Sequence, residues 1–221
     1  VDNLKTRLRD TIYTTASVAE RIYCNNDIND LINNSFTTDE EYKQFYAEHK
    51  TIDEYLNAYN QIVDIRFYLD KEDFYFNSSF RKATNVIKAS YWYNDAMEND
   101  SARWQVTKNP IDSSFYLSYV RKVYSNAGDP VGVMVIAISP EWIEGLMKDE
   151  VFSVIFSVQN GMVFYSNIDG YELGKVFVAP DVEPESKVSR TVEIKSECHL
   201  AEIGYAVAAY FDYEDTGNLF Q

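Results

Sequence analysis

Large aromatic side chains and one cation in the middle of the chain could together form a binding pocket. The residues are Trp92, Tyr93, Trp104, Tyr119 and Arg121. Aromatic rings provide flat apolar walls, and an arginine provides a fixed cation with several hydrogen-bond donors. Such a set suits a sugar, a carboxylate or an aromatic ligand. For each aromatic residue the alternative is packing in an ordinary core, where Trp and Tyr are common.

Asp129 could add a polar contact to this pocket. It lies in the turn expected before a strand at 131–138. A carboxylate there could receive a hydrogen bond from a ligand, although acidic side chains are also frequent in solvated turns. The sequence therefore predicts a ligand-binding site that consists of the five residues above and Asp129.

Motifs for metal binding and catalysis are missing from the sequence. The two histidines, His49 and His199, have no spacing to cysteines or carboxylates of the kind that zinc or facial-triad sites use. No phosphate-binding glycine loop, HExxH, GxSxG or CxxC occurs. We expect no enzymatic activity, no metal and no cofactor. A carboxylate pair of a glycoside hydrolase stays an alternative, because its geometry depends on the fold.

Composition restricts the partners. With 221 residues, of which 46% are hydrophobic, the chain can bury a substantial core. The formal net charge of -15 would repel a phosphate backbone, so nucleic acid is not an expected partner. Cys24 and Cys198 define no disulfide scaffold, and two free thiols are the favoured interpretation over a pair.

The ends of the chain and its hydropathy suggest a piece of a larger protein. No apolar run approaches the ~20 residues that a membrane span requires, and no signal-peptide pattern is present. The sequence begins at Val1 without a methionine. We therefore expect this sequence to be a piece of a larger protein whose flanking segments are absent here.

Helices dominate the expected N-terminal part, because the first glycine is Gly128 and the first proline is Pro110. An apolar stripe from Leu4 to Tyr23 predicts a helix that continues to about Ile32 and is roughly 45 to 50 Å long. Capping boxes at 37–40 and 51–54 predict two short helices that pack on it.

Alternating and helical patterns then follow one another. Period-two alternation predicts a strand at 63–69 with one buried face, and a helix is expected at 84–97. Further strands are expected at 102–107, 114–124 and 131–138, which together indicate an α+β layer.

A second β unit is expected in the C-terminal part. Ser139 and Pro140 predict the start of a helix, and Asn160-Gly161 predicts a hairpin. The segment 176–187 has the composition of a loop. The strands of this unit are expected at 152–158, 162–166, 190–194 and 203–211.

The order of these elements and several local motifs resemble the double Cache sensor domains of bacterial sensor histidine kinases and chemoreceptors. Residues 131–139 (VGVMVIAIS) resemble the last strand of the membrane-distal domain of that family. Residues 159–166 (QNGMVFYS) and 173–175 (LGK) are similar to the hairpin and the "LG" turn of the membrane-proximal domain. The resemblance implies an α+β fold with a long N-terminal helix followed by two PAS-like domains with antiparallel sheets.

The resemblance also implies a domain division. A long N-terminal helix with short packing helices would occupy 1–61, the membrane-distal ligand-binding domain 62–147, and a smaller membrane-proximal domain 148–221. The chain would then be the extracellular ectodomain of a membrane receptor. It would act as a homodimer in the full-length receptor and detect a small molecule such as a carbohydrate or an organic acid.

Amino-acid-binding members of this family show a tyrosine, an arginine five residues later, and then a tryptophan and an aromatic residue two and three positions after the arginine. Trp92 and Tyr93 match the end of this pattern, but Ser90 stands in place of the arginine and Asn85 in place of the tyrosine. We therefore do not expect an amino-acid receptor. The sequence is also compatible with a ligandless or protein-binding module of a receptor and, less well, with a secreted hydrolase.

Overall fold

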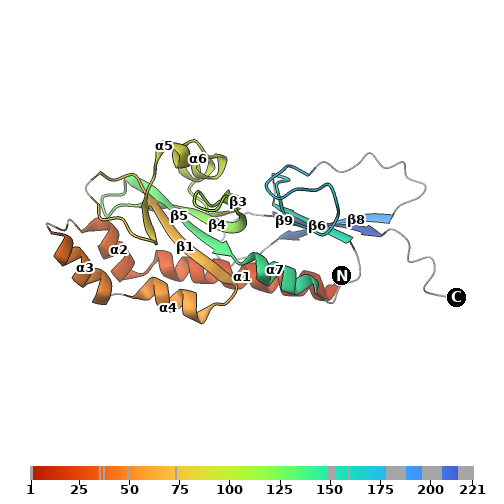
Figure 1. Ribbon diagram of the computed structural model, residues 1–221, viewed down its shortest axis with the longest axis horizontal. Coiled ribbons are helices and arrows are strands. Elements are labelled where there is room, and N and C mark those ends of the chain that lie inside the picture. Colours follow the sequence, from red (N-terminus) through yellow and green to blue (C-terminus); the bar gives the residue numbers. More distant parts are fainter. Residues whose placement is uncertain are drawn as a thin grey trace.

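The computed structural model describes residues 2–34, 36, 38–48, 50–72, 74–148, 153–158, 160–177, 188–195 and 206–213. In this part of the chain no helix is both long enough and apolar enough to cross a membrane. The chain forms two sheets, and its helices lie mainly around the first of them, as Figure 1 shows. The predicted mixed α and β architecture with an N-terminal helix is confirmed.

The N-terminal helices cover one face of the first sheet. The predicted apolar stripe is confirmed, because its members from Leu4 to Ile22 are buried. α1 lies along this face and continues beside α7, and α2, α3 and α4 extend the layer (Figure 1). The helices are α1 (Asp2–Tyr23), α2 (Asn26–Asn33), α3 (Asp39–Glu48) and α4 (Thr51–Ala58).

The predicted continuous helix to Ile32 is wrong. α1 ends at Tyr23, and its 22 residues correspond to about 33 Å. Asn25 has an extended backbone, and its side-chain oxygen accepts a hydrogen bond from the Ile28 amide at 3.1 Å, so it starts a second helix. The periodicity of the apolar residues continues across this break, which is why the pattern alone does not reveal it.

The two predicted capping boxes are also corrected. At the start of α3 the Thr38 hydroxyl accepts the Glu41 amide at 3.2 Å, and Thr37, which the sequence predicted as the cap, lies outside the described residues. α4 already includes Thr51 as a helical residue, and Lys50 before it provides no side-chain cap.

The first sheet has the strand order β2-β1-β5-β4-β3. β2 pairs with β1 in parallel, whereas the other described pairs of this sheet are antiparallel. The four strands expected in this region are confirmed, and the short β2 was not predicted. The strands are β1 (Ile62–Leu69), β2 (Phe80–Lys82), β3 (Arg103–Lys108), β4 (Phe115–Tyr124) and β5 (Pro130–Ile138).

Helices cover both faces of this sheet. On the α1 face, Ile65, Phe67 and Leu69 of β1 join the core that α1 completes. On the other face, Tyr68 of β1 packs in a smaller cluster with residues of α5 (Asn85–Lys88) and α6 (Tyr91–Glu98). The sequence predicted one buried face for β1, whereas the structure buries side chains on both of its faces. The expected helix at 84–97 is divided into these two helices at Ala89 and Ser90.

A helix and a second sheet complete the chain. The Ser139 hydroxyl accepts the Trp142 amide at 3.2 Å and begins α7 (Pro140–Met147), as predicted. The Trp142 indole donates to Thr11 at 3.1 Å and thereby fixes α7 on α1. The second sheet has the antiparallel order β7-β6-β9-β8, with β6 (Ser153–Val158), β7 (Val163–Ser166), β8 (Val188–Lys195) and β9 (Ala206–Tyr213).

The predicted Asn160-Gly161 hairpin is confirmed. It joins β6 to β7, and Gly161 has a φ of 79°, which favours glycine. The expected loop at 176–187 falls mostly on 178–187, outside the described residues. Val176, at its start, forms an isolated antiparallel bridge with Met162.

Candidate functional site

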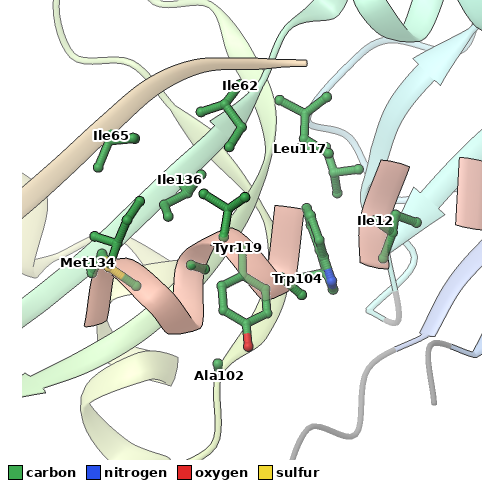
Figure 2. Close-up of a cluster of buried hydrophobic side chains, with 14 of the residues drawn as sticks. Ile12, Ile62, Ile65, Ala102, Trp104, Leu117, Tyr119, Met134 and Ile136 are labelled. Carbon is green, nitrogen blue, oxygen red and sulfur yellow. The ribbon is translucent and has the colours of Figure 1, made fainter. Parts of the chain in front are cut away.

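The residues of the predicted site lie in three different places. Trp92 and Tyr93 are on α6, on one face of the first sheet. Trp104 of β3 and Tyr119 of β4 are buried on the opposite face, in the cluster with Ile12 of α1 that Figure 2 shows. Asp129 is exposed in the turn between β4 and β5. A single pocket cannot contain all of them.

On the α1 face a polar cluster joins the sheet to the helix. The Tyr119 hydroxyl donates to Glu20 Oε1 at 3.0 Å, and the Arg121 guanidinium forms an ion pair with Glu20 Oε2. The same guanidinium lies 3.8 Å from the centre of the Tyr23 ring. We call Glu20, Tyr23, Tyr119 and Arg121 the Glu20 cluster. Its polar groups satisfy one another, so in this structure Arg121 binds α1.

The α6 face carries the candidate site, which is a cavity over β1, β3, β4 and β5. The space in it that the centre of a water-sized probe can occupy is only about 10 Å³, which is room for about one water molecule. Small-molecule pockets are far larger, so a ligand could enter this site only if the side chains that line it moved apart. The lining residues are Asp64, Arg66, Tyr68, Thr107, Lys108, Asn109, Tyr116, Val135 and Ala137.

An arginine forms the polar floor of this cavity. Arg66 forms an ion pair with Asp64, and its Nη1 donates to Asn109 Oδ1 at 2.9 Å. Its Nε is buried and has no hydrogen-bond partner among the described residues. Burial raises the pKa of the Asp64 carboxyl and outweighs the attraction of Arg66. The cavity thus has a desolvated ion pair with one unused donor.

Aromatic side chains of α6 adjoin this floor. The ring centre of Trp92 lies 5.4 Å from that of Tyr68, which lines the cavity, and 5.9 Å from that of Tyr93. The Tyr93 hydroxyl is buried without a hydrogen-bond partner in the described part of the chain. Burial raises its pKa to about 12. An unsatisfied buried hydroxyl costs stability unless a water or a ligand binds it.

Reasoning from the sequence missed the floor of the cavity. Asp64 and Arg66 alternate with apolar residues in β1, and this pattern by itself indicates a solvent-facing side. The helical segment that follows β1, at α5 and α6, could have indicated that this polar side is buried, because a helix that packs back on the same sheet covers one of its faces. Asn109 follows β3 directly and had no signal of its own.

Of the remaining cysteines and histidines, only Cys24 lies in the described part of the chain. Cys24 is exposed, whereas Cys198, His49 and His199 lie outside the described residues. Within the described ranges, no group of three His, Cys, Asp or Glu side chains could hold a metal ion.

The sequence matches no protein-family model and no curated protein. Among solved structures, the sensory domain of the Campylobacter jejuni chemoreceptor Tlp3 with isoleucine bound is similar, with a TM-score of 0.55 and 13% identity over 98% of this chain and 91% of that one. The ligand-binding domain of the Pseudomonas aeruginosa amino acid chemoreceptor PctC, in complex with GABA, gives 0.52 and 12% over 91% and 94%.

The extracellular domain of rpHK1S-Z16, described as a histidine kinase, gives a TM-score of 0.54 and 12% identity over 94% of this chain and 91% of that one. At these identities the similarity is one of fold. The chain has the fold of the sensory domains of chemoreceptors and histidine kinases, and the resemblance to Cache-type sensor domains is confirmed at that level.

Proposed function

We propose that this chain is the extracellular sensing domain of a membrane-bound signal-transduction receptor and that it binds a small molecule on the α6 face, where binding widens the cavity over Arg66. One observation carries the proposal. Arg66 Nε, in the cavity, is a buried polar atom without a partner among the described residues, and the Tyr93 hydroxyl is a second such atom on the same side of the sheet, outside the cavity lining. Such atoms are rare in folded proteins, and an absent ligand or water accounts for them.

The lining favours a small organic acid or a similarly small polar molecule. Arg66 and Lys108 contribute two cations against the single carboxylate of Asp64. An arginine with an unused donor is well suited to a carboxylate. This charge balance favours an organic acid over a neutral carbohydrate, and a ligand of either class would have to widen the cavity.

An α-amino acid is not the proposed ligand, although Tlp3 and PctC are described with isoleucine and GABA. The Ser90 hydroxyl donates to the Ile87 carbonyl and so stabilises the end of α5. Asn85 is exposed at the start of that helix. Neither residue replaces the arginine and tyrosine of the amino-acid-binding pattern.

We further propose the double Cache arrangement, with the N-terminal helices at 1–61, the membrane-distal domain at 62–147 and the membrane-proximal domain at 148–221. The element bounds support this division, since β1 begins at Ile62 and α7 ends at Met147. Flanking membrane segments would anchor both ends, the output would be a histidine kinase, and the full-length receptor would be a homodimer. Exposed α1 side chains such as Tyr13 are available for the dimer contact.

Strand β4 connects the proposed ligand site to α1. Tyr116 lines the cavity on one face of β4, and Tyr119 and Arg121 hold Glu20 of α1 on the other. If β4 and α1 can adopt two arrangements, a ligand that binds one arrangement more tightly shifts the equilibrium toward it. The size of this shift is set by the difference between the two affinities.

A thermal-shift screen of the purified chain against small carboxylates, sugars, amino acids and nucleobases tests the function. A ligand at a hundred times its dissociation constant adds about 2.7 kcal/mol to the stability, which is a clear shift. Stabilisation by a carboxylate that Arg66→Gln removes supports the proposal. No shift with any compound favours the protein-binding module, and turnover of a polysaccharide would indicate the hydrolase.

Replacing Tyr93 with phenylalanine separates ligand binding from folding. Tyr93→Phe removes an unsatisfied buried hydroxyl, so the free protein is expected to gain about 1 kcal/mol of stability. The same variant is expected to bind the stabilising compound about tenfold more weakly, because one hydrogen bond of about 1.4 kcal/mol is lost. Denaturant unfolding and calorimetric titration measure the two effects.

Tyr91→Phe is the matched control, because Tyr91 is on the same helix but 57% exposed. It is expected to change neither quantity. Unchanged affinity of Tyr93→Phe for the compound would remove Tyr93 from the site.

A further inference from the structure

We propose that a path of side-chain hydrogen bonds, Asp95–Gln105–Asn160, couples α6 to the β6–β7 hairpin of the second sheet and so transmits the state of the cavity. The proposal rests on the proposed function, because it assigns the regulation of that site. It concerns three residues on α6, β3 and the turn after β6, of which Asn160 is 55 residues from Gln105 in the sequence. We call these residues the relay.

The relay consists of two hydrogen bonds through one buried side chain. Gln105 Nε2 donates to Asp95 Oδ2 at 2.8 Å, and Asn160 Nδ2 donates to Gln105 Oε1 at 3.5 Å. Gln105 is only 6% exposed. Its amide thus uses its donor toward α6 and its acceptor toward the hairpin. The bond to Asp95 has an ordinary length, whereas the contact with the exposed Asn160 is at the long limit of a hydrogen bond, so the second step is the weaker link of the relay.

Both ends of the relay are held firmly. Asp95 Oδ1 accepts from Arg103 at 3.2 Å, and the side chain of Asp95 is 12% exposed. Asn160 Oδ1 accepts from the Met162 amide at 3.1 Å, which fixes the turn. A displacement of α6 therefore moves Gln105 and, through it, the hairpin. Asp95 lies one turn after Trp92, so α6 presents the aromatic wall and the start of the relay on one short helix.

A second contact joins the first sheet to a loop beside the second sheet. Lys108 lines the cavity, and its Nζ lies 5.6 Å from the centre of the Phe115 ring. Phe115 packs so closely on Gly174 that a Cβ added there would lie 2.3 Å from Phe115 Cε1. Two contacts thus lead from the first sheet to loops beside the second sheet, one from Gln105 to Asn160 and one from Phe115, which packs with the core on the α1 side, to Gly174. Figure 1 shows β3 and β4 on the side of the first sheet that faces the second sheet.

Hydrogen exchange can test the relay without a ligand. Trp92→Ala removes the contact of α6 with Tyr68 and serves as the perturbation. The amides of Val158 and Val163, which bond to Met162 and Lys175 carbonyls beside the turn, report on the hairpin. In the otherwise native chain, we expect Trp92→Ala to lower their protection factors at least about threefold relative to the Ile136 amide of the first sheet.

Asn160→Asp cuts the relay with little other change. The aspartate keeps the oxygen that accepts from Met162 but has no donor for Gln105. In this background we expect Trp92→Ala to leave the hairpin amides unchanged. Asp169→Asn, an exposed change beside the second sheet, is the control and should preserve the response. If Trp92→Ala reduces the folded population too far, Trp92→Phe replaces it as the perturbation.

Equal loss of protection with and without Asn160→Asp would overturn the relay, as would no response in the native background. Neither result depends on ligand binding. A silent ligand screen with an intact relay would count against the proposed function alone, and a ligand hit with no relay response would count against the relay alone.

Discussion

Replacing Gly132 with alanine is expected to destabilise the protein by about 3 kcal/mol, because the new methyl group has no space in the middle of the first sheet. Gly132 lies in β5 between Leu69 of β1 and Val123 of β4. A Cβ there would be 2.2 Å from the Tyr68 carbonyl oxygen and 2.9 Å from Leu69 Cα. Both atoms belong to the backbone, so the strands must separate to make room.

Gly145→Ala in α7 is the matched control. No atom lies within 4 Å of a Cβ built at Gly145, and alanine favours a helix by about 0.5 to 1 kcal/mol over glycine. Urea unfolding should therefore show a lower midpoint for Gly132→Ala and an equal or higher one for Gly145→Ala. Native stability of Gly132→Ala would contradict the close approach of β1 and β5.

The strands of the first sheet could be predicted because their signal is local. Alternation or a continuous apolar run marks β1, β3, β4 and β5 within a few residues. The helix break at Asn25 and the short strand β2 could not be predicted in the same way. A single capping hydrogen bond, from the Ile28 amide to Asn25, determines the helix break. The short strand β2 exists only because Phe80 pairs with Phe67 of β1, and the sequence does not show that these two segments lie side by side.

The candidate site was predicted only in part, because period two groups residues by face but does not say which helix covers that face. Trp104 and Tyr119 are cross-strand partners, and their expected proximity is present at 5.5 Å between ring centres. They face α1, however, whereas Trp92 and Tyr93 lie on the other side of the sheet. The sequence alone could not assign these faces, since both are apolar enough to be buried.

Removing the Glu20 carboxylate is expected to destabilise the fold by about 2 to 3 kcal/mol, because it leaves the Arg121 guanidinium and the Tyr119 hydroxyl without their acceptor in a largely buried position. The two partners of the ion pair are 15% and 23% exposed, so water can compensate only in part. Glu20→Ala, measured by urea unfolding, gives the size of this loss. Arg9→Ala is the control, since the Arg9–Asp10 pair on the same helix is more than half exposed and should contribute less than about 0.5 kcal/mol.

A double-mutant cycle decides between the two roles considered for Arg121. If Arg121 acts through Glu20, Glu20→Ala with Arg121→Met should cost clearly less than the sum of the single variants, because the unpaired charge is removed together with its partner. The opposite result has two parts. The losses of stability in the two single variants would add up in the double variant, and Arg121→Met alone would no longer bind a stabilising carboxylate. This result would place Arg121 in the ligand site. The structure favours the first outcome, since the guanidinium contacts Glu20 and the Tyr23 ring on the face of the sheet opposite the cavity.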